Sequence, residues 1–380
     1  MKASFLRIVI DFIKPAVLIS ALVVCGLTGS ASAEPSASMI NAFFLNTAPT
    51  DYVQLEKLFL ALKKDGANTI ILKPEFKQGR INRPLLTNEV FIAHQFGLRL
   101  FLILPTRGNG ALLADHPDWE DLRYELKSGS LQRTGRVDLF QQQAVQAVSA
   151  LYKDVAAYSV DGILLSEDFY YGATEGMSSP ALAAYKRITG TSFDERDVFG
   201  KAAAAGKIQD VEELGVRFWN WTELKKDALL NLFRAIVKAA WSANPKVKIG
   251  IPLHVEGLIT PKDELARFGY DMNRFRRMNV DYYWMAVPHR DIRAQQDLSY
   301  NKSMEILSRI VNAATTIMKD QSRSIIAVQT TDQSGKILPL SEIEEATGMI
   351  KQAGEPGIAF MINADTTLPA EFTQKTFRRK

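Results

Sequence analysis

Eight short apolar runs recur along the chain, and the stretches between them have helical periodicity. This alternation limits the fold more than any other feature of the sequence. The runs occupy residues 39–45, 68–72, 98–104, 161–165, 247–252, 281–286, 324–329 and 357–362. Most are apolar throughout, as expected of parallel strands that are buried on both faces. Between them, apolar side chains fall on one helical face within residues 52–64, 140–157, 218–241, 301–318 and 341–352.

Eight β/α repeats predict a single (β/α)₈ TIM-type barrel, an α/β fold that we assign to residues 34–380. The segment of about residues 170–217 is long for a connection, so we expect it to be a helical insertion after the fourth strand. The alternative is an open, doubly wound sheet. That fold usually has a glycine-rich turn after its first strand, whereas this chain continues as Asn46-Thr47-Ala48-Pro49. The barrel is therefore favoured.

Residues 1–33 have the pattern of a secretory signal peptide. Basic residues start the segment, an apolar run occupies residues 16–27, and Ala31-Ser32-Ala33 forms an A-x-A cleavage motif. We therefore expect a periplasmic protein without a stable membrane span after cleavage. One alternative is an uncleaved membrane anchor, but the apolar run is short for a membrane span. The other is a lipoprotein attached through Cys25, but the residue before that cysteine is Val24, where a small residue is usual. Cys25 is the only cysteine, so its removal would exclude disulfides and cysteine-ligated metals.

The charge of the chain excludes one large class of partners. The sequence has 46 Lys and Arg residues against 42 Asp and Glu residues, a formal net charge of +4. A body this close to neutral is not expected to bind nucleic acid through its phosphate backbone.

Acidic and aromatic residues gather where the strands of a barrel end, which is where TIM barrels place their active sites. Glu167 and Asp168 follow the fourth run and precede three aromatic residues. Glycoside hydrolysis needs two carboxyl groups and benefits from aromatic faces for the sugar. Adjacent acids point to opposite sides, so we expect one of the two to be catalytic. The second carboxylate is then expected from Asp291 or Glu256, and Glu75 is the next candidate after these two.

Polar and aromatic residues near the other strand ends are candidates for contact with a sugar. These candidate substrate-binding residues are Lys73, Glu75, Arg107, Tyr170, Trp221, Lys225, His254, Trp284 and His289. An alternative hypothesis is a zinc site made of the two histidines His254 and His289 with Asp168 or Asp291. None of the four histidines has the H-x-H, H-x-x-H or H-E-x-x-H spacing of metal sites, so we expect no metal and no cofactor.

Three segments resemble one known family, the C-terminal, glycoside-hydrolase-like barrel domain of the periplasmic poly-β-1,6-N-acetyl-D-glucosamine N-deacetylases (PgaB). The first is Asp161-Gly-Ile-Leu-Leu-Ser-Glu-Asp168, where the family has two acids after a histidine. The second is Trp221-Thr-Glu-Leu-Lys225 before a long helical stretch. The third is Val280-Asp-Tyr-Tyr-Trp-Met-Ala-Val-Pro-His-Arg-Asp291, whose last acid matches an acid of the family.

The resemblance implies a periplasmic glycosidase that acts on a β-linked N-acetylglucosamine or glucosamine exopolysaccharide, in the production or export of biofilm matrix. The family's deacetylase domain, with its metal-binding residues, has no counterpart in this chain. Ser166 replaces the family's histidine, and Asp291 is a shorter carboxylate than the family's acid. The alternative is a non-catalytic glycan-binding barrel that escorts the polymer to an outer-membrane exporter. The export machinery would then be its partner.

Overall fold

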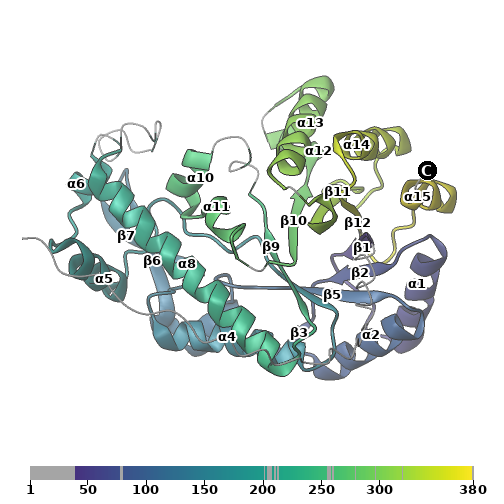
Figure 1. Ribbon diagram of the computed structural model, residues 1–380, viewed down its shortest axis with the longest axis horizontal. Coiled ribbons are helices and arrows are strands. Elements are labelled where there is room, and N and C mark those ends of the chain that lie inside the picture. Colours follow the sequence, from purple (N-terminus) through teal and green to yellow (C-terminus); the bar gives the residue numbers. More distant parts are fainter. Residues whose placement is uncertain are drawn as a thin grey trace, which may run out of the picture. The chain divides into compact units, whose positions relative to one another are not determined.

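The eight expected strands form one closed barrel (Figure 1). The computed structural model describes residues 39–77, 80–200, 202, 208, 211, 214–254, 258, 261–278, 280–295, 297–318 and 320–378. The strands are parallel and neighbour one another in the order β1-β12-β11-β10-β9-β8-β5-β2. Their bounds are β1 Asn41–Leu45, β2 Thr69–Leu72, β5 Arg99–Leu104, β8 Gly162–Leu165, β9 Lys248–Pro252, β10 Tyr282–Val287, β11 Ser324–Gln329 and β12 Gly357–Ile362. The predicted TIM-type barrel is confirmed.

Helices lie outside the strands, as the alternating pattern predicts (Figure 1). The long helix α8 packs against α4. Each helix presents an apolar stripe to the strands, because apolar residues recur three and four positions apart. The larger helices are α1 Tyr52–Lys64, α2 Arg83–Gln95, α4 Gln142–Ala156, α8 Val216–Ala243, α13 Tyr300–Ile317 and α14 Leu340–Ala353, and the short helix α15 Ala370–Phe377 follows β12.

Two antiparallel ribbons and several short helices lie in the segments that connect the barrel strands. One ribbon pairs β3 (Phe76–Lys77) with β4 (Arg80–Ile81), and the other pairs β6 (Glu120–Glu125) with β7 (Ser130–Val137). Neither ribbon was predicted from the sequence. The short helices are α3 Gly110–Asp115, η1 Pro117–Trp119, α5 Ser179–Thr189, α6 Glu195–Phe199, α10 Pro261–Phe268, α11 Met272–Phe275, α12 His289–Gln295 and η3 Gln321–Arg323. Helices α5 and α6 lie within the segment expected as an insertion.

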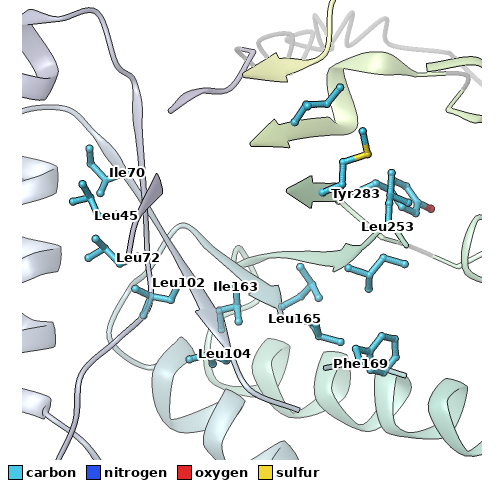
Figure 2. Close-up of a cluster of buried hydrophobic side chains, with 14 of the residues drawn as sticks. Leu45, Ile70, Leu72, Leu102, Leu104, Ile163, Leu165, Phe169, Leu253 and Tyr283 are labelled. Atoms are coloured by element: carbon cyan, nitrogen blue, oxygen red, sulfur yellow. The ribbon is translucent and has the colours of Figure 1, made fainter. Parts of the chain in front are cut away.

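The outer faces of the strands bury a layer of aliphatic side chains beneath the helices. Figure 2 shows part of this layer, with two labelled residues from each of three neighbouring strands. The members of each pair are two positions apart, because alternate side chains of a strand point to the same face. They are Ile70 and Leu72 from β2, Leu102 and Leu104 from β5, and Ile163 and Leu165 from β8.

The interior of the barrel is filled by a second, separate cluster. Its large members include Phe44, Phe101, Tyr282 and Trp284, from strands β1, β5 and β10. Small residues are needed where these rings cross the interior. At Gly162, an added Cβ would lie 2.8 Å from the Phe101 ring, so β8 passes that ring only because residue 162 has no side chain.

The predicted signal peptide, residues 1–33 with Cys25, lies outside the described residues, so the export prediction stays a prediction. Among the helices that the structure describes, none combines the length and the apolar character that a membrane crossing requires.

Candidate active site

Asp168 is bound by donors from two strand ends. Its carboxylate accepts hydrogen bonds from the Thr106 backbone N–H, at 3.1 and 3.0 Å from its two oxygens, and from the Thr106 hydroxyl at 2.7 Å. The Gly108 N–H and the Ser166 hydroxyl also donate to it. These donors link the turn after β8 to the segment after β5. Asp168 therefore fixes the shape of the site, and its oxygens are already engaged.

Gly108 allows this approach, and its substitution provides a test. An alanine Cβ at this position would lie 2.8 Å from Asp168 Oδ2. We expect Gly108→Ala to lower the free energy of unfolding by about 1–3 kcal/mol, as overpacking usually does. The measurement is chemical denaturation. Gly110→Ala is the matched control, because nothing lies within 4 Å of the added Cβ there. Equal stabilities of the two variants would show that the Asp168 contact is not tight.

Glu167, by contrast, has an exposed side chain. The surrounding protein atoms desolvate its carboxyl group and so raise its pKa above the ordinary value; the Lys73 ammonium lowers that pKa and the Asp168 carboxylate raises it further. An accessible carboxyl group with a raised pKa is suited to act as a general acid.

Lys73 is the exposed residue that follows β2, and its Nζ lies 5.6 Å from the centre of the Phe44 ring. Asn46 and Asn363, which follow β1 and β12, come within 3.5 Å of each other through their side-chain amides. Glu75, two residues after Lys73, instead accepts a hydrogen bond from Asn82 and lies 3.8 Å from Lys77, beside the β3–β4 ribbon.

Asp291 lies in the first turn of α12, just after β10, and is oriented by Gln329 at the end of β11. The Gln329 Nε2 donates to Asp291 Oδ1 at 3.2 Å and to the Thr331 carbonyl at 2.9 Å. The Gln329 Oε1 accepts from the Arg290 backbone N–H at 3.1 Å. Because both ends of the amide have defined partners, the amide points its N–H group at the carboxylate.

His289 is buried and is occupied by a structural contact. Its Nε2 lies 3.0 Å from Glu342 Oε1, and the second oxygen of Glu342 accepts from Arg290 at 3.0 Å. Burial lowers the pKa of His289, although the Glu342 carboxylate opposes that shift. His289 is only 2% exposed, so the expected contact with substrate is not available to it.

Arg107 is likewise buried, contrary to the expected role in binding substrate. Its guanidinium donates to Asp121 and Glu175, each at 2.6 Å, and also to the Tyr170 carbonyl. It stacks at 3.6 Å on the Tyr171 ring. The residue ties the β6–β7 ribbon to the segment after β8 and has no exposed surface.

Trp221 and Lys225 are also fully buried, so these two expected substrate contacts are corrected as well. Both lie on α8. The Lys225 ammonium donates to the carbonyls of Gly172 and Ala173, at 3.0 and 2.9 Å. Burial lowers its pKa to about 7. Sequence could not separate these residues from exposed ones, because the packing of α8 against the segment after β8 decides their exposure.

Two aromatic candidates have different environments. Tyr170 is partly exposed, its hydroxyl accepts from Arg136, and the Arg136 guanidinium lies 4.3 Å from the centre of its ring. Trp284 is 3% exposed and fills the barrel interior, so it offers no stacking surface to a sugar.

His254, at the end of β9, packs between aromatic rings. Its ring stacks at 5.3 Å on Phe268, and the Tyr170 and Tyr270 rings meet it edge to face. Burial lowers its pKa to about 4, so the imidazole is neutral at physiological pH. Glu256, the alternative second carboxylate, lies outside the described residues. Over the described part of the chain, no three His, Cys, Asp or Glu side chains are grouped so that they could hold a metal ion.

Residues that the sequence did not single out complete this arrangement. Thr106 and Gly108 bind Asp168, Gln329 orients Asp291, and Arg136 covers Tyr170. Thr106 and Gly108 follow a predicted strand and Gln329 ends one, which was the available signal, although their partners are distant in sequence. Arg136 lies in β7, which was not predicted.

The fold agrees with comparisons to known proteins. Residues 116–361 match the model of the family described as hypothetical glycosyl hydrolase family 13, and the chain belongs to this family. No curated protein matches the sequence.

Solved structures of glycoside hydrolases share the fold. The PgaB (BpsB) glycoside hydrolase domain from Bordetella bronchiseptica superposes with a TM-score of 0.62 at 15% identity, over 85% of this chain and 93% of that one. Gan42B, a GH42 β-galactosidase from G. stearothermophilus, gives 0.59 at 12% identity, over 86% of this chain and 51% of its own. The β-galactosidase from the psychrophilic Marinomonas ef1 gives 0.60 at 9% identity, over 88% and 59%. The chain is thus a glycoside-hydrolase-like TIM barrel.

Proposed function

We propose that this protein is a periplasmic glycosidase that cleaves a β-linked polymer of N-acetylglucosamine and glucosamine. The observation that carries the proposal is the division of roles between adjacent acids. Asp168 is engaged by backbone and hydroxyl donors, whereas Glu167 is exposed with a raised pKa at the carboxyl end of β8. A free carboxyl group on a rigid turn is what a glycosidase needs for its general acid.

Asp291 supplies the second carboxylate in this proposal. It follows β10, and a single strand, β9, separates β10 from β8 in the barrel. Two steps between neighbouring strands span roughly 10 Å, which leaves room for a sugar ring between the two acids. The amide of Gln329 keeps Asp291 in place. Tyr170 offers a partly exposed ring, which meets the ring of His254 after β9 edge to face.

The substrate class is supported by the sequence resemblance and by the acidic groups near the opening. The Asp291 carboxylate would attract the ammonium groups of a partly deacetylated polymer, although the whole chain is near neutral, because local charge governs binding. Production or export of biofilm matrix is the process in which such an enzyme would act.

The decisive experiment measures new reducing ends when purified protein is incubated with β-1,6-linked hexosamine polymers of graded deacetylation. A neutral β-galactan is the comparison substrate, because several structural neighbours are β-galactosidases. Cleavage of the hexosamine polymer supports the proposal. Cleavage of galactan alone contradicts the substrate class. Binding of the hexosamine polymer without cleavage would instead support the escort function.

The pH profile tests the assignment of Glu167. The Lys73 ammonium lowers the pKa of this acid, so its removal raises that pKa. A general acid works only while protonated, and Lys73→Met should therefore move the alkaline limb of kcat/KM to higher pH. Lys57→Met, on the exposed face of α1, is the control and should leave the limb in place. A limb that stays fixed or moves to lower pH in Lys73→Met would rule out Glu167 as the titrating acid.

A further inference from the structure

The ladder between β8 and β9 lacks one donor at its carboxyl end. The Lys248 N–H donates to the Asp161 carbonyl at 3.0 Å, and the register continues as far as Leu164 opposite Gly250. In a parallel ladder the donors recur every second residue. The next two are therefore residues 250 and 252, opposite the carbonyls of Ile163 and Leu165. Residue 252 is proline, which has no N–H to donate.

The indole of Trp284 supplies the missing donor. Its Nε1–H donates to the Leu165 carbonyl at 2.8 Å. Trp284 belongs to β10, which is not a neighbour of β8, so this bond reaches across the barrel interior past β9. The ring is 3% exposed and meets the Phe44 ring edge to face at 6.4 Å, which restricts its orientation.

The position of this bond gives it a functional meaning. Leu165 is the last residue of β8, and Ser166, Glu167 and Asp168 follow directly. On the β5 side, the strand end is held by a backbone bond from the Ser166 N–H to the Leu104 carbonyl at 2.9 Å. On the β9 side, Pro252 leaves the ladder donor absent, and the indole takes its place.

We propose that Trp284 is a positioning residue for Glu167, acting through the hydrogen bond that its indole gives to the Leu165 carbonyl. The inference rests on the proposed function, because it concerns the same acid. Without the bond, a buried carbonyl loses its partner and the turn that carries Glu167 gains freedom. Small misplacements of a catalytic group lower turnover strongly.

The test uses Trp284→Phe, Pro252→Ala and the double variant, each in the full chain. Trp284→Phe should lower kcat about tenfold or more with KM nearly unchanged. It should also speed amide hydrogen exchange across residues 162–170. Pro252→Ala returns an N–H to the ladder position, so the double variant should recover most of the lost turnover and protection. Lost packing of the larger ring could not be repaired in this way.

Trp241→Phe is the matched control, because the Trp241 indole also donates to a backbone carbonyl, that of Val247 at 3.1 Å, at the opposite end of β9. It should leave kcat unchanged. If Trp284→Phe fails to fold, site-specific replacement of Trp284 by benzothienylalanine removes the N–H while keeping the ring shape. No effect at Trp284, or a loss that Pro252→Ala does not repair, overturns the proposal. Hydrogen exchange tests the bond even if the protein cleaves no glycan. Failure of this proposal can therefore be distinguished from failure of the proposed function.

Discussion

Replacing Glu167 with glutamine should lower turnover of the polymer by about 10²–10⁴-fold, the usual contribution of general acid–base catalysis. The substitution keeps the size of the side chain but removes the proton that would be given to the glycosidic oxygen. Because Glu167 is exposed and makes no hydrogen bond on which the described fold depends, stability should change little. Reducing-end release and glycan binding, measured on the same preparation, separate lost catalysis from lost affinity.

Asp168→Asn provides the contrast within the same turn. An amide at this position would face the Thr106 and Gly108 N–H groups with fewer acceptor sites, so stability should fall together with turnover. The two variants therefore differ in stability, even if both are slow. A Glu167→Gln variant with wild-type turnover would remove Glu167 from the mechanism and return Asp168 as the candidate acid.

Replacing Arg107 with methionine should lower the free energy of unfolding by about 3–5 kcal/mol, the typical cost of removing one partner from a buried ion pair. Asp121 and Glu175 would remain buried without their cation. Burial already raises the pKa of Asp121 to about 7, and Arg107 opposes that shift. Burial acts on Glu175 in the same direction, yet the guanidinium groups of Arg107 and Arg136 keep its pKa below the ordinary value.

Urea denaturation measures this loss, and Arg83→Met is the control. Arg83 forms an exposed ion pair with Asp154 at 3.0 Å, which solvent screens, so its removal should be almost neutral. Comparable losses in the two variants would contradict the view that Arg107 is the centre of a buried network.

The barrel could be predicted because its signal is local. Each barrel strand is predicted by a short apolar run, and each large helix by a stripe of apolar residues. The order of these strands and helices can therefore be read from the sequence. The β6–β7 ribbon was not predicted, because its second strand has no apolar run. Seven of the eight residues of β7 are at least partly exposed.

The site could be predicted only as a neighbourhood. Glu167 and Asp168 are equivalent in sequence, and what separates them is the Thr106 hydroxyl and the Gly108 N–H, 62 and 60 residues away from Asp168. Arg107 looked like a binding residue because it directly follows a strand. Its burial depends on Asp121 and Glu175, which the ribbon and the segment after β8 bring to it. Such ion pairs depend on tertiary contacts, and no periodic pattern in the sequence predicts them.

The seam of the barrel has a consequence for the order in which the chain folds. β1 pairs with β12, and the Asn41 side chain donates to the Phe377 carbonyl at 3.2 Å, across 336 residues of sequence. During synthesis β1 can pair with β2 early, but its other edge stays open until nearly the whole chain has emerged. An unpaired edge of Asn-Ala-Phe-Phe-Leu is a template for wrong pairing between chains. Closure is therefore a late, non-local step, and until it occurs the open edge of β1 is exposed to pairing with other chains.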